Sequence, residues 1–136
     1  MSDDMEDLAR RLLVGRKSDG RGVYDDAAKA ELVAAIDKAV RLARDGEPGA
    51  EQLGELGEGW VAEEALAIAL YCALAAPDYT SGVLLAVNHN GDSDSTGAMA
   101  GSLLGTLHGV DNVPRKWLSA LELGRAAWQS IASQAP

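Results

Sequence analysis

Residues 88–107 read Asn-His-Asn-Gly-Asp-Ser-Asp-Ser-Thr-Gly-Ala-Met-Ala-Gly-Ser-Leu-Leu-Gly-Thr-Leu, a polar loop followed at once by a small, apolar run. This order predicts a loop that leads into a helix. Asp92 and Asp94 lie two residues apart, so both carboxylates can be directed towards one point. The hydroxyls of Ser93, Ser95 and Thr96 can complete an oxygen shell of the kind that hard cations prefer. We therefore interpret the stretch as a hard-metal site, with an anionic ligand attracted by the N–H groups of the helix start.

Two other interpretations fit parts of this pattern. A calcium-binding EF-hand loop begins with a similar order of Asp, Ser and Gly, but it needs a bidentate Glu at its twelfth position. Counted from Asp92, the twelfth residue is Leu103, which excludes the EF-hand. The remaining alternative is a helix cap that binds no ligand, in which Asp94 or Ser95 caps the helix and Asp92 is solvated.

The flanking residues extend the pattern into three segments. They read His-Asn-Gly-Asp-Ser-Asp-Ser-Thr-Gly-Ala-Met-Ala-Gly-Ser-Leu-Leu-Gly (89–105), Leu-Gly-Glu-Gly-Trp-Val-Ala-Glu-Glu-Ala-Leu-Ala-Ile-Ala-Leu-Tyr upstream (56–71) and Val-Pro-Arg-Lys-Trp-Leu downstream (113–118). Together they resemble the carboxy-terminal part of the ADP-ribosylglycohydrolase family, which includes the dinitrogenase reductase activating glycohydrolases. The resemblance covers about residues 50–125.

The resemblance implies an all-α protein with two bound Mg²⁺ ions that removes ADP-ribose from modified side chains or small acceptors. By position in the motif, the implied metal ligands are Asp92, Asp94 and Ser95. The implied ligand-binding residues belong to the same loop and are Asn88, His89, Asn90, Gly91, Ser93 and Thr96. The expected partner is therefore ADP-ribose or an ADP-ribosylated acceptor.

The family also has an amino-terminal half with a Gly-rich segment, a catalytic Glu and a Thr-Asp-Asp motif that supplies further metal ligands. None of these is recognisable in this sequence, so the resemblance predicts half of an active site and assigns no catalytic residue. Mg²⁺ needs six oxygen ligands, and we expect hydrolysis only together with the missing half, supplied by a second copy or a complementary chain. The alternatives are a non-catalytic module that binds ADP-ribose or a partner, and a scaffold whose loop is only a capped helix start.

Charge and cysteine content narrow the classes of partner and the compartment. The 136 residues carry a net charge of −9, which argues against nucleic acid and anionic membranes as partners. An anionic ligand would have to be held by metal ions, helix N-termini and backbone N–H groups. The sequence shows no secretory signal and no apolar run of about 20 residues. Cys72 is the only cysteine, which favours a reducing, cytoplasmic location and an inert, buried thiol.

Taken in order, the chain predicts a compact helical bundle with no β-hairpin signal. Residues 1–22 form an acidic, glycine-rich segment expected to be flexible, and residues 23–136 form the helical domain. Helices are expected from Asp25 or Asp26 to about residue 44, and over residues 60–75, 81–87, 96–108 and 121–132, with a short one after Pro114. Residues 46–59 are expected as a loop because of their glycines.

Three further features have both a structural and a functional interpretation. Glu63 or Glu64 could be a catalytic base, but a structural hydrogen bond to a loop is the simpler role. Tryptophans 60, 117 and 128 are expected as core anchors rather than stacking surfaces. Asp25 and Asp26 are expected to cap a helix rather than bind metal, and His108 to complement a helix C-terminus. Glycines recur at positions 97, 101, 105 and 109, which favours close approach of a neighbouring helix backbone.

Overall fold

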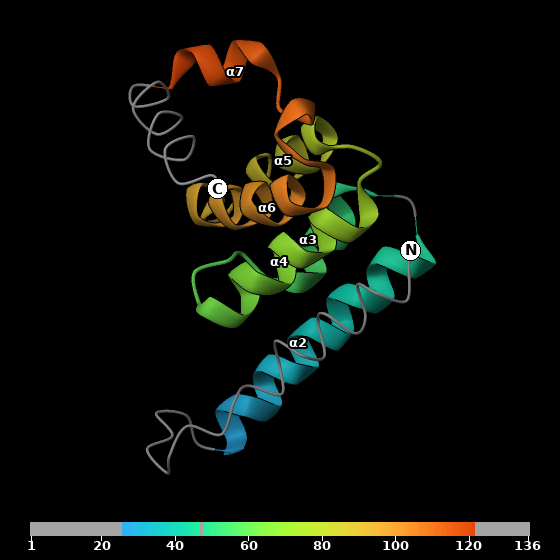
Figure 1. The fold of residues 1–136 in the computed structure, drawn as a ribbon. Helices are drawn as coiled ribbons and strands as arrows, with labels where there is room; N and C mark the ends of the chain where they lie inside the picture. The colour runs from blue at the N-terminus through green and yellow to red at the C-terminus, as the bar shows by residue number, and fades with distance from the viewer. Residues whose placement is uncertain (1–25, 47, 122–136) are drawn as a thin grey trace, which may run out of the picture.

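The computed structural model describes residues 26–46 and 48–121, and every regular element within them is helical (Figure 1). In chain order these elements are α2 (Asp26–Asp45), α3 (Ala50–Leu56), α4 (Ala62–Ala75), α5 (Tyr79–Val87), α6 (Ser93–His108), the 3-10 helix η1 (Val110–Asn112) and α7 (Arg115–Ala120). The predicted all-α fold is confirmed. The expected flexible segment 1–22, the expected helix 121–132 and Trp128 lie outside the described residues, apart from Leu121.

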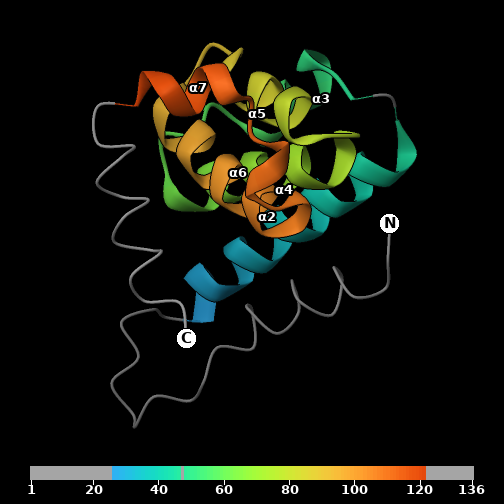
Figure 2. The same ribbon diagram turned by 45° about the horizontal axis from the view of Figure 1, so that its top comes forward.

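Helix α4 is the centre of the bundle because its surface is apolar almost all round. Ile68, Ala69, Tyr71 and Cys72 on this helix are fully buried. Helix α2 packs on one side of α4 and α6 on another, with α5 against both α4 and α6. When the molecule is turned, α2 and α7 stay on opposite sides of this core (Figure 2). Burial raises the pKa of the Cys72 thiol to about 12, so the thiol is protonated and unreactive at neutral pH.

Helix α2 presents a narrow apolar stripe to α4, with Ile36 and Ala39 fully in the core. The expectation of a loop was wrong for residues 50–56, which form helix α3. Its Leu53 and Leu56 are three residues apart and both buried. Their burial outweighs the cost of about 1 kcal/mol that Gly54 imposes inside a helix.

Helices α5 and α6 form an antiparallel pair that carries the loop between them. Asp78 caps α5, because its carboxylate accepts hydrogen bonds from the Ser81 N–H and the Ser81 hydroxyl, each at 2.9 Å. Gly82 lets α6 come close, since a Cβ at this position would lie 2.5 Å from Cδ1 of the buried Leu104. The loop between α5 and α6 is therefore anchored at both ends by well-packed helices.

The glycine ridge of α6 does face α5, but the expected approach of backbone to backbone is wrong. A Cβ at Gly97 would lie 2.5 Å from Cγ1 of Val87, and at Gly105 the nearest atom is Cε2 of Tyr79, at 3.9 Å. The ridge therefore receives side chains of α5. Gly109 ends the helix with φ at +77° and has no neighbour within 4 Å of a Cβ.

The tryptophans differ from the expected core anchors. Trp60 is 66% exposed, so the core interpretation is wrong for this residue. Trp117 on α7 is half-buried and packs against Tyr79, with 6.2 Å between the ring centroids. The helices of the described part of the chain include none with the length and apolar character of a membrane span.

Candidate functional site

The polar loop ends directly at the N-terminus of α6, which begins at Ser93, three residues earlier than expected. Asp92 is the capping residue: its Oδ1 accepts the Ser95 N–H at 3.4 Å and its carbonyl accepts the Thr96 N–H at 3.1 Å. This corrects the alternative in which Asp94 or Ser95 caps the helix and Asp92 is solvated. Asp94 and Ser95 instead lie exposed in the first turn.

The Asp92 carboxyl lies within hydrogen-bonding reach of both the Asp94 carboxyl and the Ser95 hydroxyl. The pKa of the Asp92 carboxyl is lowered, first by a hydrogen bond with the Asp94 carboxyl and then by the Ser95 hydroxyl, with smaller contributions that include the Ser95 N–H and the nearby His89. Two carboxylates this close repel each other when both are ionised. The helix N-terminus offsets part of that repulsion, and a bound cation would offset it further.

The three side chains suit a magnesium ion in chemistry but supply only part of a coordination shell. Two carboxylates and one hydroxyl are oxygen donors of the kind that Mg²⁺ prefers, yet the ion needs six ligands in an octahedron. Within residues 26–46 and 48–121, no group of three or more His, Cys, Asp or Glu side chains gathers at one point. The donors at α6 therefore fit one side of an ion, and the other positions would be filled by water, by a ligand or by residues from elsewhere.

Thr96 and His89 support the loop from inside the protein. Thr96 is fully buried, and its hydroxyl bonds to the carbonyl oxygens of Ala86 (2.8 Å) and Asp92 (3.0 Å). Nε2 of His89 lies 2.8 Å from the same hydroxyl, while Nδ1 accepts the Gly91 N–H at 3.1 Å. In this tautomer Nε2 donates to Thr96. The hydroxyl of Thr96 is thus fully engaged in hydrogen bonds within the protein. Thr96 therefore differs from the other expected ligand-binding residues.

The remaining expected ligand-binding residues differ in exposure, because Gly91 and Ser93 are half-buried. Asn88 and Asn90 are exposed, and Nδ2 of Asn88 donates to the Leu84 carbonyl at 2.6 Å, which ends α5. Ser93 donates its N–H to the Gly91 carbonyl at 2.9 Å, which forms the turn before α6. The structure thus places Gly91 and Ser93 in the turn beside the Asp92 cap, whereas the Asn88 side chain is directed back to α5.

A second loop, residues 57–61, lies against the first and was not predicted as part of the site. The Glu58 carbonyl accepts the Asp92 N–H at 2.8 Å. A Cβ at Gly91 would lie 1.7 Å from that same carbonyl oxygen, so no side chain fits there. The sequence signal was the Gly-Glu-Gly-Trp run at 57–60, but nothing in it reveals which other loop it contacts.

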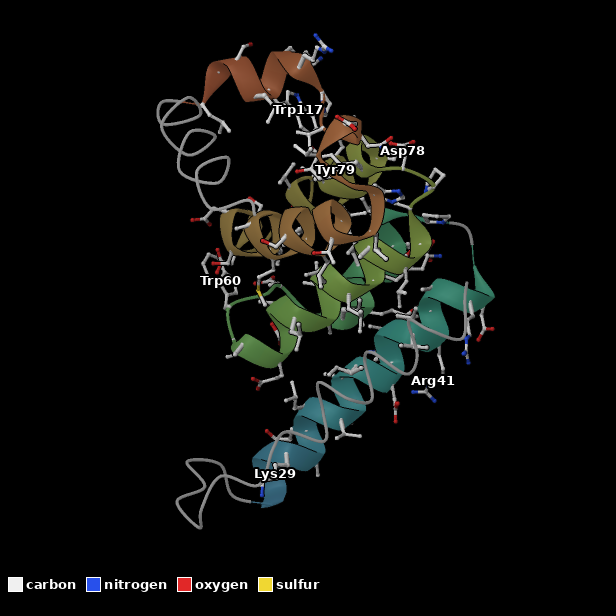
Figure 3. The ribbon with its side chains drawn as sticks, viewed as in Figure 1. Lys29, Arg41, Trp60, Asp78, Tyr79 and Trp117 are labelled. Atoms are coloured by element: carbon white, nitrogen blue, oxygen red, sulfur yellow. The ribbon has the colours of Figure 1, made fainter. Side chains whose placement is uncertain are left out.

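Trp60 projects from this second loop as an exposed aromatic surface. Its indole Nε1 donates to Oε2 of Glu58 at 2.9 Å, which restrains the ring. Figure 3 shows Trp60 beside the N-terminal end of α6, whereas Asp78, Tyr79 and Trp117 lie near the other end of that helix. The expected alternative role of a tryptophan, a stacking surface, is thus available at Trp60.

Comparison with known proteins matches nearly the whole chain to one protein family. Residues 2–135 match the ADP-ribosylglycohydrolase family. The ADP-ribosyl-[dinitrogen reductase] glycohydrolase of Rhodospirillum rubrum is 47% identical over 45 residues, which are 33% of this chain and 15% of that protein. The ADP-ribosylhydrolase ARH3 of Homo sapiens is 31% identical over 83 residues, 53% of this chain and 23% of the relative.

An ADP-ribosylarginine hydrolase of Serratia proteamaculans (strain 568) is 29% identical over 82 residues, 60% of this chain and 22% of that protein. The chain thus spans about a quarter or less of the length of these relatives. No solved structure gives a significant match.

Proposed function

The chain belongs to the ADP-ribosylglycohydrolase family, and from that premise we propose that its α6 N-terminus and the two adjoining loops hold ADP-ribose together with Mg²⁺. The observation that carries the proposal is that the Asp92 carboxyl, at the capped start of α6, interacts with both the Asp94 and the Ser95 side chains. An acidic chain needs such a site, because a diphosphate is otherwise repelled by the net charge of −9. The relatives named above act on ADP-ribosylated molecules, which supports the choice of ligand.

Each part of the site has a proposed task in holding the ligand. Asp92, Asp94 and Ser95 coordinate the ion, and Asn88, His89, Asn90, Gly91 and Ser93 border the ribose. Trp60 offers an indole face for stacking on a base, a contact worth about 1–3 kcal/mol. The chemistry that Mg²⁺ supplies when bound is to polarise oxygens and to orient a water molecule for attack.

Hydrolysis of an ADP-ribosylated acceptor needs more than the described residues offer, and we propose that a complementary half provides it. The three oxygen donors fill half of a magnesium shell. The carboxylate of Glu64, in the first turn of α4, is taken up by hydrogen bonds to backbone N–H groups, and the catalytic residue stays unassigned. Further metal ligands and a general acid or base would therefore come from that half.

One observation favours a second candidate, a non-catalytic module that binds ADP-ribose. The site has a preformed loop and an exposed aromatic ring, which suit binding, whereas the Glu64 carboxylate beside it is already held by two backbone N–H groups. Binding of ADP-ribose by the isolated chain, with no hydrolysis after any candidate complementary chain is added, would favour this module over the hydrolase.

The proposed complementary half implies an interface beside the site. Val61 and Val87 are exposed, and like Trp60 they flank the loops: Val61 follows Trp60, and Val87 contacts Gly97 in the first turns of α6. Covering these side chains would remove apolar surface from water. We expect a dimer or larger assembly, or a complex with a complementary chain. A single monomeric species in sedimentation velocity at high concentration would count against self-association.

Titration of Mg²⁺ into the isolated chain, followed by calorimetry, tests the metal assignment. Asp94→Asn is the sharpest variant, because Asp94 is exposed and does not cap the helix, whereas Asp92 does. We expect this variant to weaken Mg²⁺ binding by at least about tenfold, in line with the loss of a ligand charge. The matched control is Asp111→Asn, an exposed carboxylate on η1, which should change nothing. Equal affinities of wild type and Asp94→Asn would refute the assignment.

A further inference from the structure

Glu64, half-buried in the first turn of α4, directs its carboxylate towards the neighbouring loop. Its Oε2 accepts two backbone N–H groups, from Glu58 at 3.2 Å and from Gly59 at 3.0 Å. Gly57 makes room for it, since a Cβ there would lie 2.4 Å from the Glu64 carboxyl carbon. Gly57 and Gly59 also have φ of +106° and +81°, a conformation that glycine adopts without strain. The loop is thus built around this carboxylate.

The peptide unit between Glu58 and Gly59 connects Glu64 to the proposed metal ligands. Its N–H, on Gly59, donates to Glu64, and its carbonyl, on Glu58, accepts the Asp92 N–H at 2.8 Å. A donor and an acceptor on one peptide polarise each other, so each bond strengthens the other. Gly91, with no space for a Cβ against the Glu58 carbonyl, keeps the two backbones at this distance.

We infer that Glu64 is a positioning residue for the metal-binding end of α6. The carboxylate fixes the Glu58–Gly59 peptide, and this peptide fixes the Asp92 backbone from which the capped turn with Asp94 and Ser95 begins. Residues that orient metal ligands commonly affect affinity without touching the ion. The inference rests on the proposed function for the identity of the ligand, but the link between Glu64 and Asp92 can be tested without any metal.

Two variants of Glu64 separate positioning from charge. In Glu64→Gln the side-chain oxygen can still accept both N–H groups, because a single oxygen accepts them now. In Glu64→Ala no acceptor remains. The matched control is Glu63→Gln, which removes an identical charge from the same first turn of α4, at a side chain with no hydrogen bond to the part of the chain that the structure describes. If the charge alone mattered, all substitutions that remove it would act alike.

The first arm measures amide hydrogen exchange by NMR in the metal-free protein. We expect the Asp92 and Gly59 amides to exchange at least about tenfold faster in Glu64→Ala. The Gly59 N–H loses its acceptor, and the Glu58 carbonyl that accepts the Asp92 N–H is no longer held in place. Glu64→Gln should retain most of the protection, and Glu63→Gln all of it. The Ala100 amide, in the buried part of α6, reports any global loss of stability and corrects for it. Unchanged exchange at Asp92 in Glu64→Ala would overturn the inference.

The second arm titrates Mg²⁺ into the same four proteins. We expect the dissociation constant to rise about 10–100-fold in Glu64→Ala and to return close to that of the wild type in Glu64→Gln. Equal losses in the Ala and Gln variants would show an effect of charge and overturn the positioning role. If the wild type binds no Mg²⁺, the proposed function fails, and the exchange experiment alone then decides whether Glu64 positions Asp92.

Discussion

Gly91 is the residue at which the two loops of the site meet most closely. Its replacement by alanine would place a Cβ 1.7 Å from the Glu58 carbonyl oxygen, so the loops must separate and the Asp92–Glu58 hydrogen bond is lost. We expect Gly91→Ala to lower the free energy of unfolding by about 1–3 kcal/mol, measured by urea denaturation. Gly54→Ala is the control, because a Cβ there meets nothing within 4 Å in α3. That variant should be more stable than wild type by about 0.5–1 kcal/mol.

Asp78 makes the stability of α5 depend on pH. Hydrogen bonds from the Ser81 N–H and hydroxyl lower the pKa of its carboxyl. A carboxyl with a lowered pKa in the folded state stabilises the protein above its unfolded pKa of about 3.9, and this contribution is lost as the pH falls through the folded value. Asp78→Ala should therefore have a lower Tm than wild type at neutral pH. The two Tm values should converge in acid below about pH 4. A difference that stays constant into strong acid would contradict this assignment.

For single residues, the sequence predicted contacts between near neighbours in the chain well and contacts between separate loops poorly. The convergence of Asp92 with Asp94 follows from their spacing of two residues at a helix start, so it was accessible from the sequence alone. The burial of the Thr96 hydroxyl and the link between Glu58 and Asp92 were not, because both depend on which loop packs against which. The exposure of Trp60 was missed for the same reason: an aromatic residue near an apolar helix is usually buried.

Among the elements, the connection between α5 and α6 depends on one buried side-chain hydroxyl, that of Thr96. Thr96→Val keeps the shape but removes the bonds to the Ala86 and Asp92 carbonyls and leaves Nε2 of His89 without its partner. We expect a loss of about 1–3 kcal/mol in the free energy of unfolding. Thr96→Ser, which keeps the hydroxyl, should lose less than Thr96→Val. The reverse order would show that the methyl group, rather than the hydrogen bonds, stabilises the connection.

Helix α6 offers a direct comparison between a tight and an open glycine. A Cβ at Gly97 would lie 2.5 Å from Cγ1 of Val87, whereas at Gly105 the nearest atom is 3.9 Å away. Gly97→Ala should destabilise the protein by about 1–3 kcal/mol because it pushes α5 from α6. Gly105→Ala should instead raise stability by about 0.5–1 kcal/mol, through better helix propensity. Thermal unfolding of both variants decides the matter, and equal shifts would refute this description of the ridge.

The helices that the sequence predicted are those whose patterns are long or uniform. Helix α4 was recognisable from its apolar run and α2 from its stripe. Helix α3 was missed because seven residues with a glycine inside show no periodicity of their own, and only the burial of Leu53 and Leu56 stabilises it. The start of α6 was placed three residues late because Asp92, Asp94 and Ser95 are all good capping residues, and only the backbone geometry selects one.

For the whole molecule, the proposed function requires an acidic protein to hold an anionic ligand. The described residues place the proposed metal ligands, a capped helix N-terminus and an exposed indole at one end of α6. The same end carries the exposed Val61 and Val87. Ligand site and proposed interface thus lie side by side, which is the arrangement expected if a complementary half completes the metal shell. Family membership could be predicted from the sequence because it rests on three ordered segments, whereas the assembly depends on surfaces that only the fold reveals.

The most direct test of the central claim is calorimetric titration of ADP-ribose into the purified chain, with Mg²⁺ and with a chelator. It should be repeated with Asp94→Asn and with Asp111→Asn as control. We predict binding that requires Mg²⁺, that is lost or much weakened in Asp94→Asn and that is unchanged in Asp111→Asn. Binding of equal strength in the presence of the chelator, or in Asp94→Asn, would contradict the proposal that this end of α6 holds ADP-ribose through a metal ion.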